Sequence, residues 1–217
     1  MMDWSPLTIS IKVSLCALVL VVLAGLPIAY ALSRWKVRGR SLAEGIVTLP
    51  LVMPPTVLGY FLLVALGRQS AFGKFYEGLF HQPLVFTWQG ASVAAAAASL
   101  PLLVIQARTA FDNVDRDIED SARLCGASEW KVFTHVTLPL SQRGIAGGVV
   151  LAYARALGEF GATLMVAGSI PGRTRTMPLA IYDGLISGDN HTVTVFVTIG
   201  FIITLIFTLL ASRLAGR

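Results

Sequence analysis

Residues 13–33 read VSLCALVLVVLAGLPIAYALS, a run without a single charged side chain. A helix needs about 20 apolar residues to cross the hydrocarbon layer of a membrane, because lipid offers no partner to a bare backbone N–H or C=O group. Three further uncharged runs exceed that length, at residues 45–67, 82–107 and 190–212. These four runs predict four membrane-spanning helices.

A fifth apolar stretch, residues 144–168, is interrupted only by Arg155 and Glu159. Residues four apart lie on one face of a helix, so these two charges can pair, and pairing is the usual fate of charged groups inside a membrane. We expect a span here as well, the fourth in chain order. The predicted fold is an all-α membrane protein, a five-span helical bundle forming a single transmembrane domain over residues 1–217.

The composition disfavours other classes of protein. Of 217 residues, 55% are hydrophobic and 13% are charged, whereas soluble domains carry about 25% charged residues. The histidines His81, His135 and His191 are isolated in different loops and the two cysteines lie far apart, so we expect no metal site, bound cofactor or disulfide framework. The net charge of +5 fits lipid topology better than nucleic-acid binding, because the basic residues stand between apolar runs.

The distribution of these basic residues predicts the orientation. Eleven of the 17 Lys and Arg residues fall on one side of the expected spans and four on the other. The cytoplasmic side of a membrane protein carries the excess of basic residues. We therefore expect a multi-pass protein of the cytoplasmic membrane, with its N-terminus outside and its C-terminus inside. The larger set comprises Arg34, Lys36, Arg38, Arg40, Arg108, Arg116, Arg123, Lys131, Arg143, Arg213 and Arg217.

The first run has an alternative interpretation as a secretory signal. Residues 29–31 read AYA, a pattern that signal peptidase accepts. However, residues 1–11 carry no positive charge, and the apolar run is too long for the hydrophobic region of a signal peptide. A retained span is the better interpretation.

The inner loop at residues 112–143 has a different composition, with six of the chain's 12 acidic residues. Its pattern predicts a short helix over residues 118–124, ended by Gly126 in the left-handed conformation. Ser128 is expected to cap a second turn over residues 129–134, and Pro139 to open the next span. From composition alone, a solvated connection between spans is an equally good interpretation.

The spacing in this loop resembles a known pattern. Asp120-Ser121-Ala122, three residues, Gly126, nine residues and then Val136-Thr137-Leu138-Pro139 is similar to the signature loop of bacterial ABC importer permeases, which reads Glu-Ala-Ala, three residues, Gly, nine residues, Ile, any residue, Leu-Pro. The differences at Asp120, Ser121 and Val136 are conservative. The resemblance implies a coupling helix that inserts into a groove of a separate cytoplasmic ATPase. The residues implied in this contact are Glu119, Asp120, Ser121, Ala122, Gly126, Val136, Leu138 and Pro139.

Two more stretches narrow the resemblance, LPLVMPPTVLGY at residues 49–60 and ARALGEFGAT at residues 154–163. Both resemble the molybdate permeases, and sulfate and tungstate permeases share a weaker form. The resemblance implies a type I ABC importer permease (MetI-like) fold and a homodimer with two ATPase subunits, which bind the ATP and Mg. A periplasmic molybdate-binding protein would deliver the ion for alternating access. Tungstate and sulfate or thiosulfate are the alternative cargoes.

Candidate pathway residues come from the interrupted spans. Pro50, Pro54 and Pro55 break the second span, which suits either a pathway wall or a packing kink. Arg155, Glu159 and Thr163 recur every four residues and predict a polar stripe, in which Arg155 either guides an oxyanion or ties helices together with Glu159. The small residues Gly144, Gly148, Ala152 and Ala156 form a neighbouring ridge that predicts close helix packing.

Two functions of other classes compete with transport. A membrane enzyme acting on lipid phosphates would use Arg and acidic residues near the interface, but the sequence shows no nucleophile with an adjacent base. A purely structural anchor would leave the spacing from Asp120 to Pro139 unexplained. The chain has no Gly-x-x-x-x-Gly-Lys-Ser/Thr loop, so it cannot itself be the ATPase, and we expect no catalytic residues in it.

Overall fold

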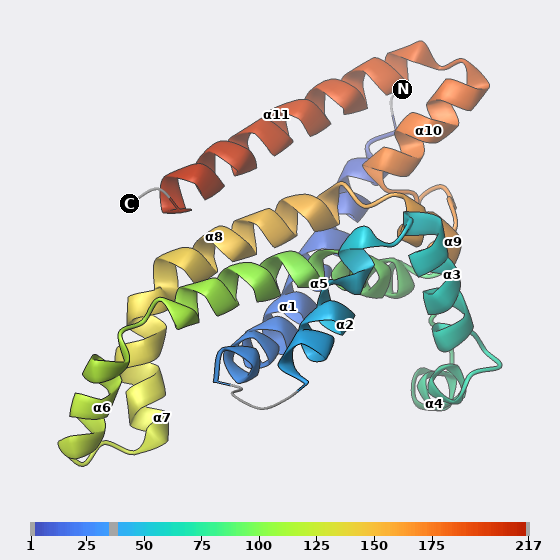
Figure 1. Cartoon of the computed structure of the whole chain (residues 1–217). Helices are drawn as coiled ribbons and strands as arrows, with labels where there is room; N and C mark the ends of the chain where they lie inside the picture. Colours follow the sequence, from blue (N-terminus) through green and yellow to red (C-terminus); the bar gives the residue numbers. More distant parts are fainter. Residues whose placement is uncertain (1–2, 35–38, 216–217) are drawn as a thin grey trace.

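The computed structural model describes residues 3–34 and 39–215, with side chains up to residue 213. Lys36, Arg38 and Arg217 of the expected inner charges lie outside these residues. All regular secondary structure in the described residues is helical (Figure 1). The helices are α1 (Ser5–Arg34), α2 (Arg40–Val52), α3 (Pro55–Leu66), α4 (Ala71–Phe80), α5 (Trp88–Asp112), α6 (Arg116–Leu124), α7 (Glu129–Val132), the π-helical η1 (Phe133–Thr137), α8 (Leu138–Leu157), α9 (Gly161–Ala167), α10 (Met177–Ser187) and α11 (Asn190–Ala215).

Three of the expected spans are single helices. Within the described residues, α1, α5 and α11 are each long and apolar enough to cross a membrane. The other two expected spans are bent pairs: α2 and α3 meet at 111°, and the helix over Glu129–Leu157 meets α9 at 57°. If each bent pair counts as one span, the protein has the five that the sequence predicts.

The break in the second span follows from its prolines. Pro54 takes an extended conformation (φ −54°, ψ 134°) and Pro55 begins α3, where a missing N–H group costs nothing. Pro50 lies inside α2 without ending it. The break therefore falls at Met53 and Pro54, inside the stretch that the sequence marks as interrupted.

The fourth span is broken, which corrects the prediction of a continuous helix. The sequence predicts one helix over residues 144–168, but α8 ends at Leu157 and α9 begins only at Gly161. Gly158 follows the last turn of α8, and Phe160 leaves the helical region with φ −121°. Glycine is a weak helix former, so Gly158 favours an end to the helix. The Glu159 side chain then accepts a hydrogen bond from the N–H of Ala162 in the first turn of α9.

The core forms where small residues allow helices to approach. The alanine-rich face of α5 is packed, as the sequence predicts, with Ala91, Ala94 and Ala95 fully buried. The small-residue ridge of α8 packs against α5: a Cβ atom added to Gly144 would lie 2.6 Å from the Cβ atom of Ala110. That prediction is confirmed, since close approach of helix backbones needs small side chains.

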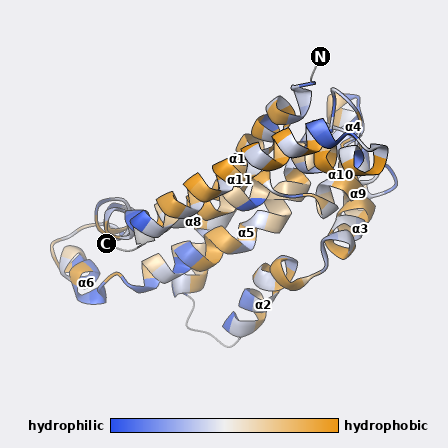
Figure 2. Ribbon diagram, turned by 90° about the horizontal axis from the view of Figure 1, so that it is seen from above, coloured by the Kyte–Doolittle hydropathy of each residue, from blue (hydrophilic) through white to orange (hydrophobic). Residues whose placement is uncertain are grey.

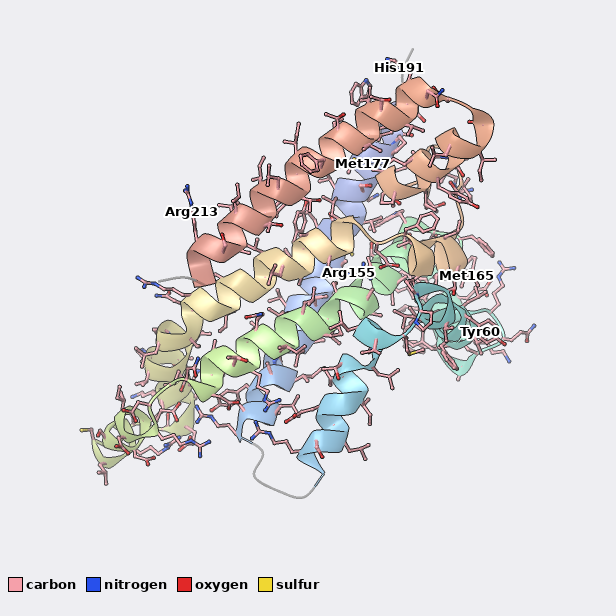
Figure 3. All side chains as sticks on the ribbon, turned by 45° about the horizontal axis from the view of Figure 1, so that its top comes forward. Tyr60, Arg155, Met165, Met177, His191 and Arg213 are labelled. Atoms are coloured by element: carbon pink, nitrogen blue, oxygen red, sulfur yellow. The ribbon has the colours of Figure 1, made fainter. Side chains whose placement is uncertain are left out.

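The polar parts lie at the two ends of the bundle. Figure 1 shows α6, α7 and the C-terminus at one end, and the N-terminus, α4 and α10 at the other. Along α11, His191 and Arg213 mark the opposite ends (Figure 3). Apolar residues dominate the long helices between them (Figure 2). The signature loop thus extends from the same end of the bundle as the C-terminus.

Candidate functional site: the signature loop and the broken spans

The signature loop begins with the helix α6. The Asp115 carboxylate accepts a hydrogen bond from the backbone N–H of Asp117 at 2.9 Å and so caps the first turn. The acidic Asp117 and Glu119 in the first turn and Arg123 in the last all suit the helix dipole. Gly126 follows with φ +85°, the left-handed conformation that the sequence predicts. The helix starts two residues before the predicted boundary.

The second turn joins the loop to α8 without a break. Ser128 precedes α7, as predicted, but its hydroxyl makes no capping hydrogen bond. Pro139 is near the start of α8, as predicted, yet the helix continues from α7 through η1. In η1 the N–H of Leu138 donates to the carbonyl of Phe133, five residues back. Such a wide turn relieves the clash that a proline ring makes with the carbonyl four residues before it.

The residues implied in ATPase contact do not all face outward. The structure exposes Asp120, Ser121, Gly126 and Pro139, whereas Ala122, Val136 and Leu138 are partly buried. Glu119 differs from them, because only 1% of its surface is exposed. Glu119 therefore contacts the rest of the chain.

Two large apolar residues that the sequence analysis did not select are strongly exposed in this loop. Leu124 is 88% exposed and Trp130 is 73% exposed, although both lie in the polar end of the bundle. Large apolar side chains held in such surroundings are typical of a protein contact surface. The sequence does contain a signal for this surface, because a leucine and a tryptophan stand there in an otherwise charged segment.

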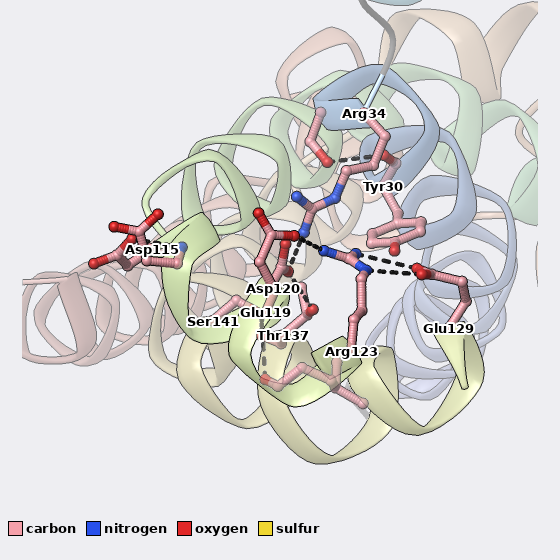
Figure 4. Close-up of polar contacts among 12 residues, drawn as sticks. Tyr30, Arg34, Asp115, Glu119, Asp120, Arg123, Glu129, Thr137 and Ser141 are labelled. Carbon is pink, nitrogen blue, oxygen red and sulfur yellow. Dashed lines mark hydrogen bonds and ion pairs between the residues drawn. The ribbon is translucent and has the colours of Figure 1, made fainter. Parts of the chain in front are cut away.

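The two short helices of the loop are clamped together by Arg123 (Figure 4). Its Nη1 atom lies 2.5 Å from Asp120 Oδ1, and its Nε atom lies 2.7 Å from Glu129 Oε1. These hydrogen bonds, that to Glu129 foremost, raise the pKa of Arg123, and the guanidinium in turn lowers the pKa of Glu129. The loop thus forms one polar-braced hairpin.

Glu119 holds this hairpin to the bundle. Its Oε1 atom pairs with Nη2 of Arg34, at the end of α1, and accepts a hydrogen bond from the Thr137 hydroxyl at 2.5 Å. One buried carboxylate thereby joins α6, α1 and η1 (Figure 4).

A second polar group lies at the break between α8 and α9. Nη1 of Arg155 lies 2.6 Å from Oε2 of Glu159, so the predicted pairing is confirmed. Oε1 of Glu159 accepts a hydrogen bond from the N–H of Ala162 at 2.8 Å, and the Thr163 hydroxyl donates to the carbonyl of Phe160 at 2.8 Å. The Glu159 carboxylate as acceptor and the Thr163 hydroxyl as donor thus each satisfy a backbone group around the first turn of α9.

The predicted polar stripe is therefore divided. Arg155 lies in the last turn of α8 and Thr163 belongs to α9, so the three residues do not follow one helix face. Glu159 and Thr163 are buried, whereas 32% of the Arg155 side chain is exposed. Figure 3 shows Arg155 in the middle of the bundle, away from both polar ends.

The breaks of the two bent spans lie together. A Cβ atom added to Gly161 would lie 2.6 Å from Cβ of Pro55, and one added to Gly59 would lie 2.6 Å from Cβ of Met165. The starts of α3 and α9 are thus in direct contact. The structure brings Pro54 and Pro55 next to the segment that holds Glu159 and Thr163.

A metal centre is not among the features of the described residues. No group of three or more His, Cys, Asp or Glu residues there is arranged to hold a metal ion. The polar residues described above instead bond to backbone groups or to each other.

Comparison with known proteins identifies the family. Residues 21–217 match the model of the binding-protein-dependent transport system inner membrane component. The chain belongs to this family. It is a permease subunit of the ABC transporter class and a multi-pass inner membrane protein, and it is not itself an enzyme.

Named relatives of this permease are similar over most of their length. It is 38% identical over 217 residues to the molybdenum transport system permease protein ModB of Haemophilus influenzae, covering 100% of this chain and 95% of the relative. It is 44% identical over 180 residues to the protein of the same name from Escherichia coli, covering 83% and 79% of the two chains.

A solved structure shares the fold of the permease. A chain of the bacterial alginate ABC transporter, crystallised with its alginate-bound periplasmic protein, superposes with a TM-score of 0.67 at 17% identity. The match covers 97% of this chain and 78% of the other. The predicted fold class, that of the type I ABC importer permeases, is confirmed.

Proposed function

We propose that this permease forms the membrane pathway of an ATP-driven importer of molybdate, which works by alternating access. The relatives that carry the name of molybdenum transport support this cargo, because one matches the chain over its full length and another over 83% of it. The observation that carries the transport mechanism is the exposed hairpin of α6 and α7, which presents Leu124 and Trp130 at the polar end of the bundle. A surface of this kind suits the groove of a separate ATPase.

The proposed assembly contains two copies of this chain, two cytoplasmic ATPase subunits that bind ATP and Mg, and a periplasmic molybdate-binding protein. The permease itself binds no cofactor in this proposal. The exposed residues of the signature loop, Asp120, Ser121 and Gly126, would meet the ATPase. The end with α6 and the C-terminus then faces the cytoplasm, and the N-terminus lies outside.

The proposed pathway runs beside the meeting point of the broken spans. Pro54, directly before α3, and Pro55, its first residue, line this pathway, and Arg155 offers a partly exposed guanidinium to a passing oxyanion. Because Glu159 already neutralises Arg155, the attraction for the ion is weak, and weak binding allows release. Selectivity for molybdate would then rest on the binding protein.

Uptake into proteoliposomes tests the cargo. The permease, its ATPase and the binding protein are reconstituted, and radiolabelled molybdate uptake is measured with ATP on the ATPase side. We expect uptake that needs ATP and the binding protein, and that excess unlabelled molybdate suppresses. Preferential uptake of sulfate or tungstate over molybdate would contradict the proposal.

Two substitutions in the signature loop test its contact with the ATPase. Gly126→Arg and Ala122→Glu each add a large side chain to the hairpin, so we expect loss of the hydrolysis that the loaded binding protein stimulates, while membrane insertion continues. Stimulated hydrolysis at the wild-type level in both variants would contradict a docking role.

Cysteine labelling tests the orientation. Cys125 is exposed beside Gly126, and an added cysteine at Asp189 lies at the other end of the bundle. With Cys16 replaced by serine, an impermeant maleimide should label position 189 in intact cells and Cys125 only after the membrane is opened. The reverse pattern would place the N-terminus inside.

A further inference from the structure

The attachment of α6 to the rest of the chain is unusual for a helix. Its single buried side chain is Glu119, a charged residue, while its apolar Ile118 and Leu124 are 48% and 88% exposed. Helices ordinarily pack through an apolar stripe. We propose that Glu119 is the joint through which α6, driven by the ATPase, moves two membrane spans together. This proposal rests on the proposed role of α6 in coupling.

The joint bridges elements that are far apart in the sequence. Arg34 stands at the last residue of α1, and Thr137 ends η1, directly before α8. Both donate to the same oxygen of Glu119. A displacement of α6 that preserves these two bonds must therefore carry the inner ends of α1 and α8 with it.

The surroundings of the joint favour a strong bond. The Arg34 guanidinium carbon lies 5.3 Å from the ring centroid of Tyr30. The Tyr30 ring in turn packs on Phe111 at 5.5 Å and on Phe133 at 4.7 Å between centroids. Aromatic rings from α1, α5 and η1 thus form one side of the joint. In such a low-dielectric setting a paired charge is held firmly, and an unpaired one is costly.

No neighbouring carboxylate among the described residues is placed to take over the pairing of Glu119 with Arg34. Arg34, Arg116, Arg123 and Asp120 line one pocket with it, and the Nε atom of Arg34 is buried without a hydrogen-bond partner. Asp120 is already bonded to Arg123. Asp120 and Glu129 both pair with Arg123, so loss of the Glu119 charge would leave Arg34 without its carboxylate partner, and α6 should separate from α1.

The hydrogen bonds of Glu119 transmit a movement of α6 differently from an apolar contact. Apolar surfaces are non-directional, so two helices can slide along each other at little cost. A carboxylate oxygen shared by two donors is effective only over a short range and in a narrow set of directions. The clamp of Arg123 keeps α6 and α7 rigid, so a push on the exposed Leu124 reaches Glu119.

The test measures molybdate uptake per ATP hydrolysed in proteoliposomes that contain the ATPase and the binding protein. Glu119→Gln keeps the size of the side chain and removes its charge, and we expect uptake per ATP to fall at least tenfold while the ATPase stays bound. Arg34→Gln should have a similar effect, and the double variant should be no worse than either single one, because both remove the same bond. Asp117→Asn, an exposed neighbour on α6, is the matched control and should behave as wild type.

Three results would overturn the proposal: a wild-type ratio in Glu119→Gln, loss of the ATPase from that variant during purification, or additive effects in the double variant. If Glu119→Gln is not inserted into the membrane, Thr137→Val removes one donor alone, and a wild-type ratio there overturns the proposal equally. The wild-type complex measured alongside separates the two proposals. Absence of uptake in that complex contradicts molybdate import, whereas a defect confined to the variants concerns Glu119.

Discussion

Pro55, the first residue of α3, lies against Gly161, the first residue of α9, so that the two broken spans touch at their breaks. The contact is so close that a Cβ atom on Gly161 would stand 2.6 Å from Cβ of Pro55. Real side chains do not approach to this distance. Any side chain at position 161 therefore forces α3 and α9 apart, close to Arg155 and its partner Glu159.

Gly161→Ala tests this contact. We expect the free energy of unfolding to fall by about 1–3 kcal/mol, the usual cost of overpacking, and molybdate uptake to fall with it. Thermal unfolding of the purified complex in detergent measures the first effect. Gly200→Ala, in a helical position with open space around it, is the control. Equal melting temperatures for the two variants would show that the contact tolerates a methyl group.

The spans show how far sequence alone reaches. Uncharged runs and prolines are enough to predict the five segments and the break at Pro54, because both effects are local. The break before Gly161 depends on Glu159, whose carboxylate bonds to the N–H of Ala162 and to Arg155. A single glycine inside an apolar run does not reveal that such a bond will accompany a break of three residues in the helix.

The exposed apolar side chains of the signature loop lead to a second prediction. Leu124→Ala and Trp130→Ala should each weaken binding of the ATPase about fivefold or more, since a large apolar side chain at the centre of an interface can contribute over 1 kcal/mol. Phe75→Ala is the matched control, because Phe75 is 70% exposed at the opposite end of the bundle. Binding of the ATPase to immobilised permease measures the effect. Loss of affinity with Phe75→Ala of the same size would show a non-specific effect of removing surface apolar groups.

The loop also shows why the faces of a short helix are hard to predict. The spacing from Asp120 to Pro139 is visible in the sequence, and the positive φ of Gly126 follows from it. The burial of Glu119 does not follow, because its two partners are 85 and 18 residues away. Local pattern predicts the helix, whereas distant side chains decide which face is turned inward.

The third prediction concerns the packing of α8 on α5. Gly144→Ala adds a methyl group 2.6 Å from Cβ of Ala110 and should lower the free energy of unfolding by about 1–3 kcal/mol. Gly147→Ala lies one turn along the same helix, where the nearest atom is the Ala211 carbonyl oxygen at 4.0 Å. It should change the melting temperature little, since alanine is the better helix former. A larger loss from Gly147→Ala than from Gly144→Ala would contradict the packing of this ridge.

The last prediction concerns a ring of four charges that holds α2. Oε1 of Glu44 lies 2.7 Å from Nε of Arg40 and 2.9 Å from Nη1 of Arg108, and Asp112 Oδ2 lies 3.4 Å from a nitrogen of each arginine. No residue of α2 is fully buried. The ring, together with a few partly buried apolar contacts, therefore fixes α2 to the inner end of α5.

Glu44→Gln should loosen α2 without unfolding the bundle. Because the ring is partly exposed, we expect a loss of about 0.5–1 kcal/mol, which corresponds to amide hydrogen exchange in α2 that is roughly two to five times faster. Added salt should produce a similar change in the wild type, since ions screen exposed charges. Glu77→Gln removes a carboxylate of α4 that pairs with Arg68 and should leave exchange in α2 unchanged. Exchange that is equally slow in Glu44→Gln and wild type would mean that the apolar contacts alone hold α2 in place.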